Sequence, residues 1–270
     1  MERIKRNERL GVMLRTLCET PNRIHTLSEF CALFGAAKST VSEDIEMLKG
    51  SLERFGQGEL STVAGAAGGV RYRGTIGDDQ ARALLTELAG TLSAPDRQLP
   101  GGFLYTSDVA GNPELSARLG QLLAQRYYDA RAHFVLTMET KGIPIAMMTA
   151  RALDVPLVIA RRDSYAYEGP AVKINYVAGR SSEKIETMAL ARRMVAPGQR
   201  ALIIDDFMKG GGTLRGMVDM MAEFQAEVVG VGVMIATAEP AQKRVEGVAS
   251  LLTLHGAGKG FKVTPSEIYR

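Results

Sequence analysis

Apolar residues in the first part of the chain recur at the spacing of amphipathic helices. The pattern predicts helices over residues 3–19 and 38–54, with a short helix between them that begins after Thr26. Thr26 and Glu29 fit a capping box, in which the Thr side chain closes the first turn and the Glu side chain reaches back. A tight turn at Gly35 precedes the third helix. This order of elements is the outline of a helix-turn-helix unit.

Two short stretches with strand-like patterning follow these helices. Leu60–Val63 and Val70–Arg73 are typical of strands, and the segment AGAAGG between them is typical of a flexible loop. A hairpin in this position would be the wing of a winged helix, or a plain hairpin that closes a small core. We therefore expect an N-terminal winged helix-turn-helix domain over residues 1–74 and a linker over residues 74–77.

From residue 75 to residue 270, short apolar runs alternate with helical patterns. Asp78 or Asp79 caps a first helix, and Asn112-Pro113-Glu114 is a strong start for another. The further elements that we expect are strands over 133–137, 156–160, 201–205 and 228–236, and helices over 143–153, 182–195 and 214–224. Such alternation implies an α/β domain with a central parallel sheet, and ligands of such sheets bind at the carboxyl ends of the strands.

Composition is that of an ordinary globular protein. The 270 residues are 46% hydrophobic and 23% charged, which excludes a disordered chain, and no apolar run approaches the ~18 residues of a membrane span. The charged start MERIKRNERL is unlike a signal peptide, so we expect a cytoplasmic protein. Cys18 and Cys31 are expected to be buried free thiols. The three histidines lie far apart without ligand spacing, and we expect no structural zinc.

The net charge of +3 is mild, so any contact with nucleic acid must come from local clusters. The third helix opens with small, polar or basic residues that suit a DNA groove, whereas the acids at 43, 44 and 46 must face away from phosphate. The cations at positions 3, 5, 6 and 9, which precede or flank the first helix, form either a phosphate-contacting arm or a solvated face. The candidate DNA-binding residues are Arg3, Lys5, Arg6, Lys38, Ser39, Thr40, Ser42, Arg71 and Arg73. A helical module that binds protein or dimerises remains the alternative.

The stretch ALIIDDFMKGGGT, residues 201–213, carries the clearest chemical signal. Four apolar residues end at Asp205 and Asp206, and three glycines then free the backbone N–H groups to converge on an anion where a helix begins. The only Lys of this stretch, Lys209, precedes the glycines, which excludes the nucleoside-triphosphate loop. Paired carboxylates suit the vicinal hydroxyls of a sugar whose phosphate sits in the loop. A strand that ends in a Gly-rich turn with capping acids is the alternative.

Two further stretches are placed to meet the same ligand. METKG, residues 138–142, follows a predicted strand end, and its amides and Lys141 could hold a second phosphate group or form a simple capped turn. Residues 163–183 carry tyrosines, glycines and cations between two core elements, which suits a hairpin or lid over the site.

These residues resemble known families. ALIIDDFMKGGGT resembles the phosphoribosyl-pyrophosphate signature of phosphoribosyltransferase folds, and METKGIP resembles their pyrophosphate loop. Together with a winged helix, and with GAAGGV, LPGG and NYVAGR, the chain is similar along nearly its whole length to the bacterial purine operon repressors. The larger domain is then expected to be a type I phosphoribosyltransferase fold that most resembles the xanthine-type branch.

The resemblance implies a role for each matching residue. Asp205 and Asp206 are expected at the ribose hydroxyls, Lys209 to Thr213 at the 5-phosphate, and Thr140 to Gly142 at the pyrophosphate. The full set of implied effector-binding residues is Tyr105, Thr140, Lys141, Gly142, Asp205, Asp206, Phe207, Met208, Lys209, Gly210, Gly211, Gly212 and Thr213. The resemblance also implies a homodimer that represses purine synthesis genes and leaves double-stranded operator DNA when phosphoribosyl pyrophosphate binds.

The resemblance leaves two activities open. Hypoxanthine-guanine-type transferases carry an acid at the position of Lys209, and a cation there favours binding a polyanion over proton transfer to a purine. We therefore expect no enzyme activity and no required cofactor, with Mg²⁺ as a candidate companion of the effector. A guanosine polyphosphate is a second candidate ligand. A purine phosphoribosyltransferase of the xanthine type is the alternative, because other branches with a small residue at this position are active.

Overall fold

The computed structural model describes residues 4–65, 68–99, 103–164, 169–177, 185–256 and 261–269. Contacts divide the chain into two compact units, one formed by Met1–Gly77 with Arg151–Asp154 and the other by Asp78–Ala150 with Val155–Arg270. Among the described helices, none is long and apolar enough to cross a membrane.

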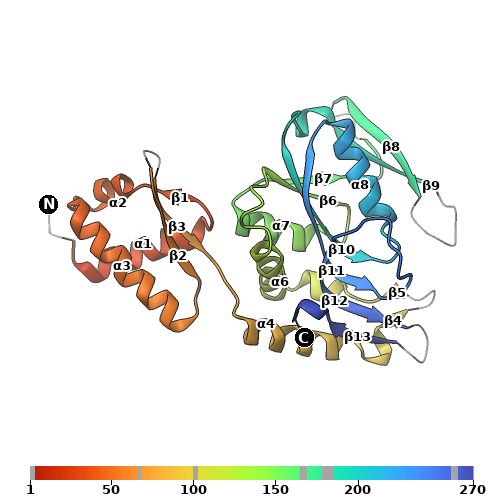
Figure 1. The fold of residues 1–270 in the computed structure, drawn as a ribbon, viewed down its shortest axis with the longest axis horizontal. Helices are drawn as coiled ribbons and strands as arrows, with labels where there is room; N and C mark the ends of the chain where they lie inside the picture. Colours follow the sequence, from red (N-terminus) through yellow and green to blue (C-terminus); the bar gives the residue numbers. More distant parts are fainter. Residues whose placement is uncertain are drawn as a thin grey trace. The chain divides into compact units, whose positions relative to one another are not determined.

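The smaller unit is a winged helix, as predicted. Its elements are α1 (Arg6–Glu19), β1 (Ile24–His25), α2 (Leu27–Phe34), α3 (Lys38–Phe55), β2 (Glu59–Val63) and β3 (Gly69–Arg73). The strands form an antiparallel sheet in the order β1-β3-β2, so β2 and β3 make the predicted hairpin (Figure 1). Apolar side chains of the three helices and the sheet share one core, with Met13, Phe30, Val41 and Leu60 almost fully buried.

The helix ends follow the local sequence. The Thr26 side chain accepts a hydrogen bond from the Glu29 amide at 3.2 Å, and Gly35 ends α2 in the left-handed conformation at φ 58°. The Glu29 carboxylate lies 3.2 Å from His25 Nδ1, so it pairs with that ring instead of completing the expected capping box. Cys18 and Cys31 are free as expected, but both are partly exposed, since they lie at the margins of the helix stripes.

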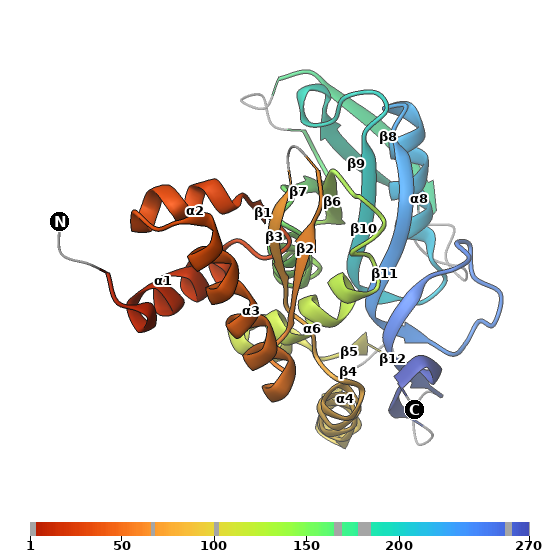
Figure 2. The same cartoon turned by 60° about the vertical axis from the view of Figure 1, so that its left-hand side comes forward.

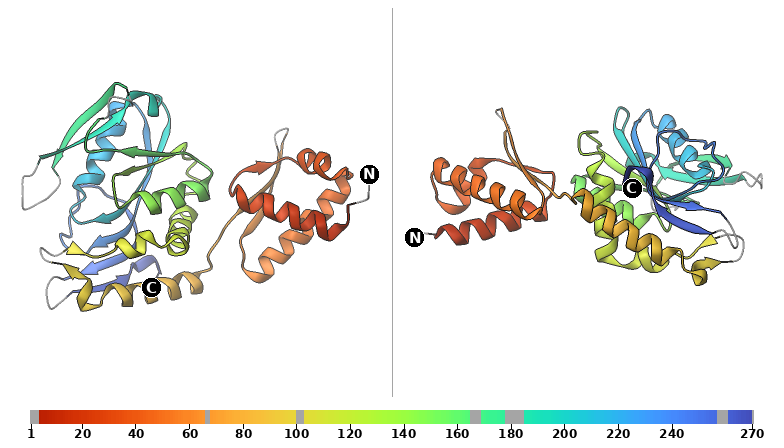
Figure 3. Two further views of the ribbon diagram at one scale, coloured as in Figure 1. Left: turned by 180° about the vertical axis from the view of Figure 1, so that it is seen from behind. Right: turned by 60° about the horizontal axis from the view of Figure 1, so that its bottom comes forward.

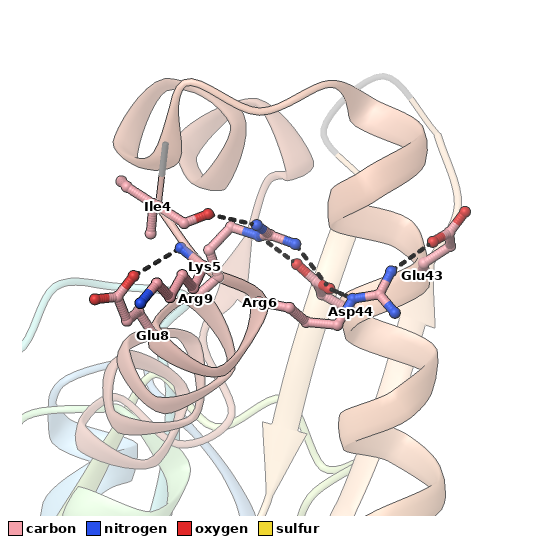
Figure 4. A network of polar contacts seen from close by, with 7 residues as sticks. All are labelled: Ile4, Lys5, Arg6, Glu8, Arg9, Glu43 and Asp44. Carbon is pink, nitrogen blue, oxygen red and sulfur yellow. Dashed lines mark hydrogen bonds and ion pairs between the residues drawn. The ribbon is translucent and has the colours of Figure 1, made fainter. Parts of the chain in front are cut away.

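A buried ion pair joins α1 to α3 (Figure 4). Asp44 is completely buried, and its carboxylate accepts hydrogen bonds from Arg9 Nε at 2.6 Å and Arg9 Nη2 at 3.2 Å. Arg6 Nε lies 3.2 Å from the same carboxylate, and Arg6 Nη2 donates to Glu43 at 2.9 Å. The hydrogen bond to Asp44 raises the pKa of Arg9 despite partial desolvation. Both charges are therefore compensated inside the core, and this fixes the angle between the two helices.

The larger unit is built on a six-stranded sheet in the order β13-β12-β11-β10-β6-β7, which is parallel except for the β12–β13 pair (Figures 1 and 2). Its sheet strands are β6 (Phe134–Met138), β7 (Leu157–Ala160), β10 (Arg200–Met208), β11 (Glu227–Thr237), β12 (Ala249–His255) and β13 (Lys262–Pro265). Its α-helices are α4 (Asp78–Leu92), α5 (Ser107–Gly111), α6 (Pro113–Gln125), α7 (Ile143–Leu153) and α8 (Gly212–Glu223). The expected α/β fold with a central parallel sheet is confirmed.

Successive residues of β10 point to opposite faces of the sheet. Ala201 and Ile203 belong to the core that includes α8, whereas the Ile204 side chain lies beside Leu123 of α6 at Gly232. Helices therefore cover both faces, as the views in Figure 3 show. The Asn112 side chain caps α6 by accepting from the Leu115 amide at 3.1 Å, as predicted.

Residues 182–195 were expected to form a helix, and this prediction is wrong. The described part forms β9 (Ile185–Ala191), followed by a 3₁₀ turn at Arg192–Met194. β9 pairs antiparallel with β8 (Ala171–Val177) along seven residues, and this pairing overrides the helix propensity of Glu, Met, Ala and Leu. The expected hairpin at 163–183 therefore has its first arm in β8, while residues 165–168 and 178–184 lie outside the described part.

Other strands had no counterpart in the predictions. β12 and β13 extend the sheet beyond β11, and two short strands, β4 (Gln98–Leu99) and β5 (Phe103–Leu104), pair with each other. β10 also runs three residues further than expected, through Met208. The strand therefore contains both aspartates and ends directly before Lys209, where the Gly-rich loop begins.

The buried Asp44 gives a stability prediction. Asp44→Ala leaves the Arg9 guanidinium buried without its partner, so we expect α1 and α3 to lose about 3 kcal/mol of stability. Glu43→Ala removes a neighbouring acid of the same helix whose side chain is 66% exposed, and its effect should be much smaller. Hydrogen exchange of the α1 and α3 amides, followed by mass spectrometry, measures both. Equal protection in the two variants would contradict the assignment of the pair as a structural centre.

Candidate functional site

The site lies where two neighbouring parallel strands end. β6 pairs with β10 through Phe134–Leu136 and Ala201–Ile203, so the METKG segment after β6 meets the DDFMKGGGT segment of β10 and its loop. These stretches are more than sixty positions apart in the sequence. The sheet alone brings them together, as predicted from the alternation of strands and helices.

Gly142 is packed directly against Asp205. A Cβ atom at Gly142 would overlap Asp205 Oδ1 and would lie 2.5 Å from Thr137 Oγ1, so only glycine fits there. Asp205 is 6% exposed, and the Thr137 hydroxyl is buried without a hydrogen-bond partner among the described residues. The peptide bond between Glu139 and Thr140 is cis. The METKG segment is thus held with its backbone against the first aspartate.

Burial suppresses ionisation of both aspartates. Burial, and then the neighbouring charge of Asp206, raise the pKa of Asp205 well above its ordinary value. Burial also raises the pKa of Asp206, and the positive charge of Lys141 opposes that shift. Asp205 Oδ1 accepts a hydrogen bond from the Asp206 amide at 3.0 Å. A ligand that brings hydroxyl donors or a cation to these carboxylates would relieve an unfavourable pair of charges.

The Gly-rich loop leads into the N-terminus of α8. Gly211 has φ 81° and caps the helix, which begins at Gly212. The first amides of a helix lack partners within it and carry its positive dipole end, so they favour an anion. The loop therefore has the geometry of a phosphate site.

The β8–β9 hairpin packs on α8 and touches the same region, as Figures 1 and 2 show. A Cβ at Gly216 would lie 2.9 Å from Met188 Cε and 3.0 Å from Tyr176 Cγ, so glycine permits this close packing. The Tyr176 hydroxyl donates to Glu186 at 2.9 Å. Burial and this carboxylate raise the pKa of Tyr176 to about 12, while the Thr213 side chain lowers it. The hairpin is thus linked to the first turn of α8.

The structure brings together most of the predicted effector residues. Gly142 packs against Asp205, and the charge of Lys141 acts on Asp206, while Thr140 precedes these two residues in the same segment. Phe207 and Met208 continue β10 into the loop that holds Lys209, Gly210, Gly211, Gly212 and Thr213. The Lys209 side chain is exposed. The contacts described for Tyr105 are with Arg97, whose guanidinium lies 5.6 Å from the ring centre, and none joins Tyr105 to this loop.

The candidate DNA-binding residues fall into two groups. Lys38, Ser39 and Ser42 are exposed, and Thr40 partly so, at the start of α3. Lys5 is exposed, whereas Arg6 is engaged with Asp44 and Glu43, and Arg73 Nε donates to Asn22 at 2.9 Å. Arg71 is partly buried beside it, and Arg3 lies outside the described residues.

Sequence reasoning missed three residues near these surfaces. Arg9 was counted only among the cations that flank the first helix, and nothing in its spacing indicated a buried partner. Tyr176 was grouped with the hairpin tyrosines without a role. Lys243, whose ammonium donates to the carbonyl of Lys209 at 2.6 Å, lies 34 positions away from it. Only the fold reveals these contacts.

Two family models match the chain. "Bacterial purine repressor, N-terminal" matches residues 5–74, and "Phosphoribosyl transferase domain" matches residues 106–265. The purine biosynthesis transcriptional repressor PurR of Bacillus subtilis is 40% identical over 252 residues, which cover 93% of this chain and 88% of that protein. The purine biosynthesis transcriptional activator PurR of Lactococcus lactis is 39% identical, over 92% of each chain.

Phosphoribosyltransferases match a smaller share of the chain than the PurR relatives do. Xanthine phosphoribosyltransferase of Limosilactobacillus fermentum is 32% identical over 180 residues, which cover 63% of this chain and 92% of the enzyme. A crystal structure of adenine phosphoribosyltransferase from Rhodothermus marinus is similar in fold, with a TM-score of 0.53 at 24% identity, covering 64% of this chain and 99% of that chain. The two family models cover both units, and the PurR relatives match nearly the whole chain. The chain therefore belongs to the bacterial purine repressor family.

Proposed function

We propose that this protein is a transcriptional repressor of purine biosynthesis genes that binds operator DNA as a homodimer and is released by phosphoribosyl pyrophosphate. The observation that carries the proposal is that one chain of this family joins a winged helix to a phosphoribosyltransferase-type domain. The candidate sugar-phosphate site of that domain, residues 138–142 and 205–213, is called the cradle below. A winged helix alone would not respond to a metabolite. The cradle alone would be compatible with an enzyme.

The chemistry of the cradle fits this effector. A phosphorylated ribose offers two vicinal hydroxyls to Asp205 and Asp206, and hydroxyl donors suit carboxylates whose ionisation is disfavoured. The 5-phosphate suits the amides at the start of α8, and the pyrophosphate suits Lys141 and the METKG backbone. Mg²⁺ would add positive charge beside the aspartates. A guanosine polyphosphate carries similar groups and would compete for the same cradle.

The DNA contact is expected at the open start of α3 and at the wing. Lys38, Ser39 and Ser42 are free to approach a groove, and Arg71 and Arg73 lie on the wing strand β3. Since Arg6 is held by two acids, the contribution of the α1 arm would come from Lys5 and Arg3. We therefore propose that the start of α3 makes the main operator contact, and that the α1 arm contributes fewer cations than its sequence suggests.

Release requires that the effector bind the two states of the repressor differently. A ligand with several negative charges would neutralise Lys141 and Lys209 and would reorder the β8–β9 hairpin, whose Tyr176 already reaches the first turn of α8. Both changes are local to the cradle. They supply the difference in free energy that a population shift needs.

A purine phosphoribosyltransferase of the xanthine type is the second candidate. The 32% identity to a named xanthine phosphoribosyltransferase favours it, and the same cradle would hold the substrate. Lys209 argues against it, because an ammonium group at this position favours binding of a polyanion and cannot accept a proton from the purine as a carboxylate can.

One paired assay separates these functions. On a single preparation, we expect a duplex from a purine-gene control region to be bound in a gel-shift titration, and phosphoribosyl pyrophosphate to weaken that binding by about tenfold or more, the range of ordinary allosteric coupling. Nucleotide formation from xanthine, hypoxanthine, guanine or adenine should be absent. DNA binding that ignores the effector, or turnover without DNA binding, would refute the repressor proposal.

The raised pKa of Asp205 gives a second prediction. Asp205→Asn removes a buried charge, so the variant should unfold at a higher temperature than the wild type at neutral pH while losing its response to the effector.

The pH dependence follows from the sign of that shift. The folded pKa of Asp205 lies above its unfolded value of about 3.9, so the wild type loses stability relative to the variant as pH rises between these two values. The gap in melting temperature should therefore shrink toward zero at about pH 3.5 and below. Asp219→Asn, on the exposed side of α8, is the matched control and should change neither property. A variant less stable than wild type at neutral pH would contradict this account.

A further inference from the structure

Residues 237–244 bind the Gly-rich loop through the carbonyl groups of the loop. Lys243 Nζ donates to the carbonyl oxygens of Lys209 at 2.6 Å and Thr237 at 2.7 Å, and to Thr237 Oγ1 at 3.0 Å. The Arg244 amide donates to the carbonyl oxygen of Gly210 at 3.0 Å. Two consecutive carbonyls of the loop are therefore bound from one side.

These bonds fix the direction of the loop amides. A trans peptide unit is planar and places its C=O and N–H on opposite sides. The carbonyl of Lys209 shares a peptide unit with the amide of Gly210, and the carbonyl of Gly210 shares one with the amide of Gly211. Because both carbonyls are drawn toward Lys243 and Arg244, both amides face away from them. Among the described residues, neither amide has an acceptor.

The Lys243 ammonium has no donor left for a ligand. An ammonium group has three N–H donors, and the three contacts with Lys209 and Thr237 use all of them. Burial lowers the pKa of Lys243, while the nearby Glu239 opposes this shift. Lys243 thus differs from Lys209 and Lys141, whose side chains are exposed. It can act on a bound anion only through the backbone that it holds.

We propose that Lys243 is a positioning residue of the effector site, which holds the 209–211 backbone so that the amides of Gly210 and Gly211 point at a phosphate group. The inference rests on the proposed function for the identity of the ligand, phosphoribosyl pyrophosphate. Thr237 belongs to the same arrangement, because its hydroxyl accepts from Lys243 and lies 3.2 Å from the carbonyl oxygen of Lys209.

Calorimetric binding of phosphoribosyl pyrophosphate to the full chain tests the proposal. Lys243→Met keeps the aliphatic stem and removes the ammonium, and we expect it to weaken binding roughly tenfold, since two charge-assisted hydrogen bonds lose their preset direction. Lys262→Met, at an exposed lysine of β13, is the matched control and should bind as wild type. Binding by Lys243→Met at wild-type strength would overturn the proposal.

A double-mutant cycle separates positioning from direct contact. Thr237→Val removes the hydroxyl of the same arrangement, so the double variant Thr237→Val with Lys243→Met should lose less than the product of the two single losses. Losses that multiply would mean that Lys243 acts on the ligand independently, and would overturn the inference.

A ligand-free readout keeps the two proposals distinguishable. In ¹⁵N-glycine-labelled protein, Lys243→Met should shift or broaden the amide signals of Gly210 and Gly211 and leave Gly120, which is buried between α6 and α7, unchanged. If the wild type binds no phosphoribosyl pyrophosphate, the proposed function fails, and these signals alone decide the role of Lys243. Unchanged signals at Gly210 and Gly211 would refute it.

Discussion

The contact between Gly142 and Asp205 is the constraint on which the proposed effector site depends. It exists because β6 and β10 are parallel neighbours, so the segments that follow them meet at one edge of the sheet. No side chain fits between the two, and the METKG backbone therefore covers the first aspartate and buries it. Burial raises the pKa of that carboxyl, and a site that disfavours its own charge gains from a ligand with hydroxyls or an accompanying cation.

The Gly-rich loop, which forms the other half of the site, is positioned by contacts to its carbonyl groups. The carbonyls of the Gly-rich loop are held by Lys243 and the Arg244 amide, while the cations that are free to meet an anion, Lys141 and Lys209, are exposed. Preset amides lower the entropy lost when a phosphate binds. The fold thus separates two kinds of cation. Lys243 binds the loop carbonyls, whereas the exposed Lys141 and Lys209 are available to the proposed polyanionic ligand.

The sequence predicted the elements whose signal is local. The apolar run before Asp205, the glycines before α8, the Thr26 cap and the Asn112-Pro113 helix start depend on neighbouring residues, and the structure has each of these elements in place. The failures are nonlocal. Residues 185–191 carry helix-forming side chains but pair with β8.

Ion pairs and backbone clamps between distant residues were equally invisible. Asp44 was expected only to be one of three acids that face away from phosphate, yet it is buried, because Arg9, 35 positions earlier, pairs with it. Lys243 gave no signal because its partners are carbonyl groups, which every residue carries.

The central proposal is that effector and operator bind different sites of one protein and that each weakens the binding of the other. Linkage makes this coupling reciprocal. Calorimetric affinity for phosphoribosyl pyrophosphate, measured without DNA and with saturating operator duplex, tests it most directly. We expect operator to weaken effector binding by the same factor by which the effector weakens operator binding, and equal affinities under the two conditions would contradict this coupling.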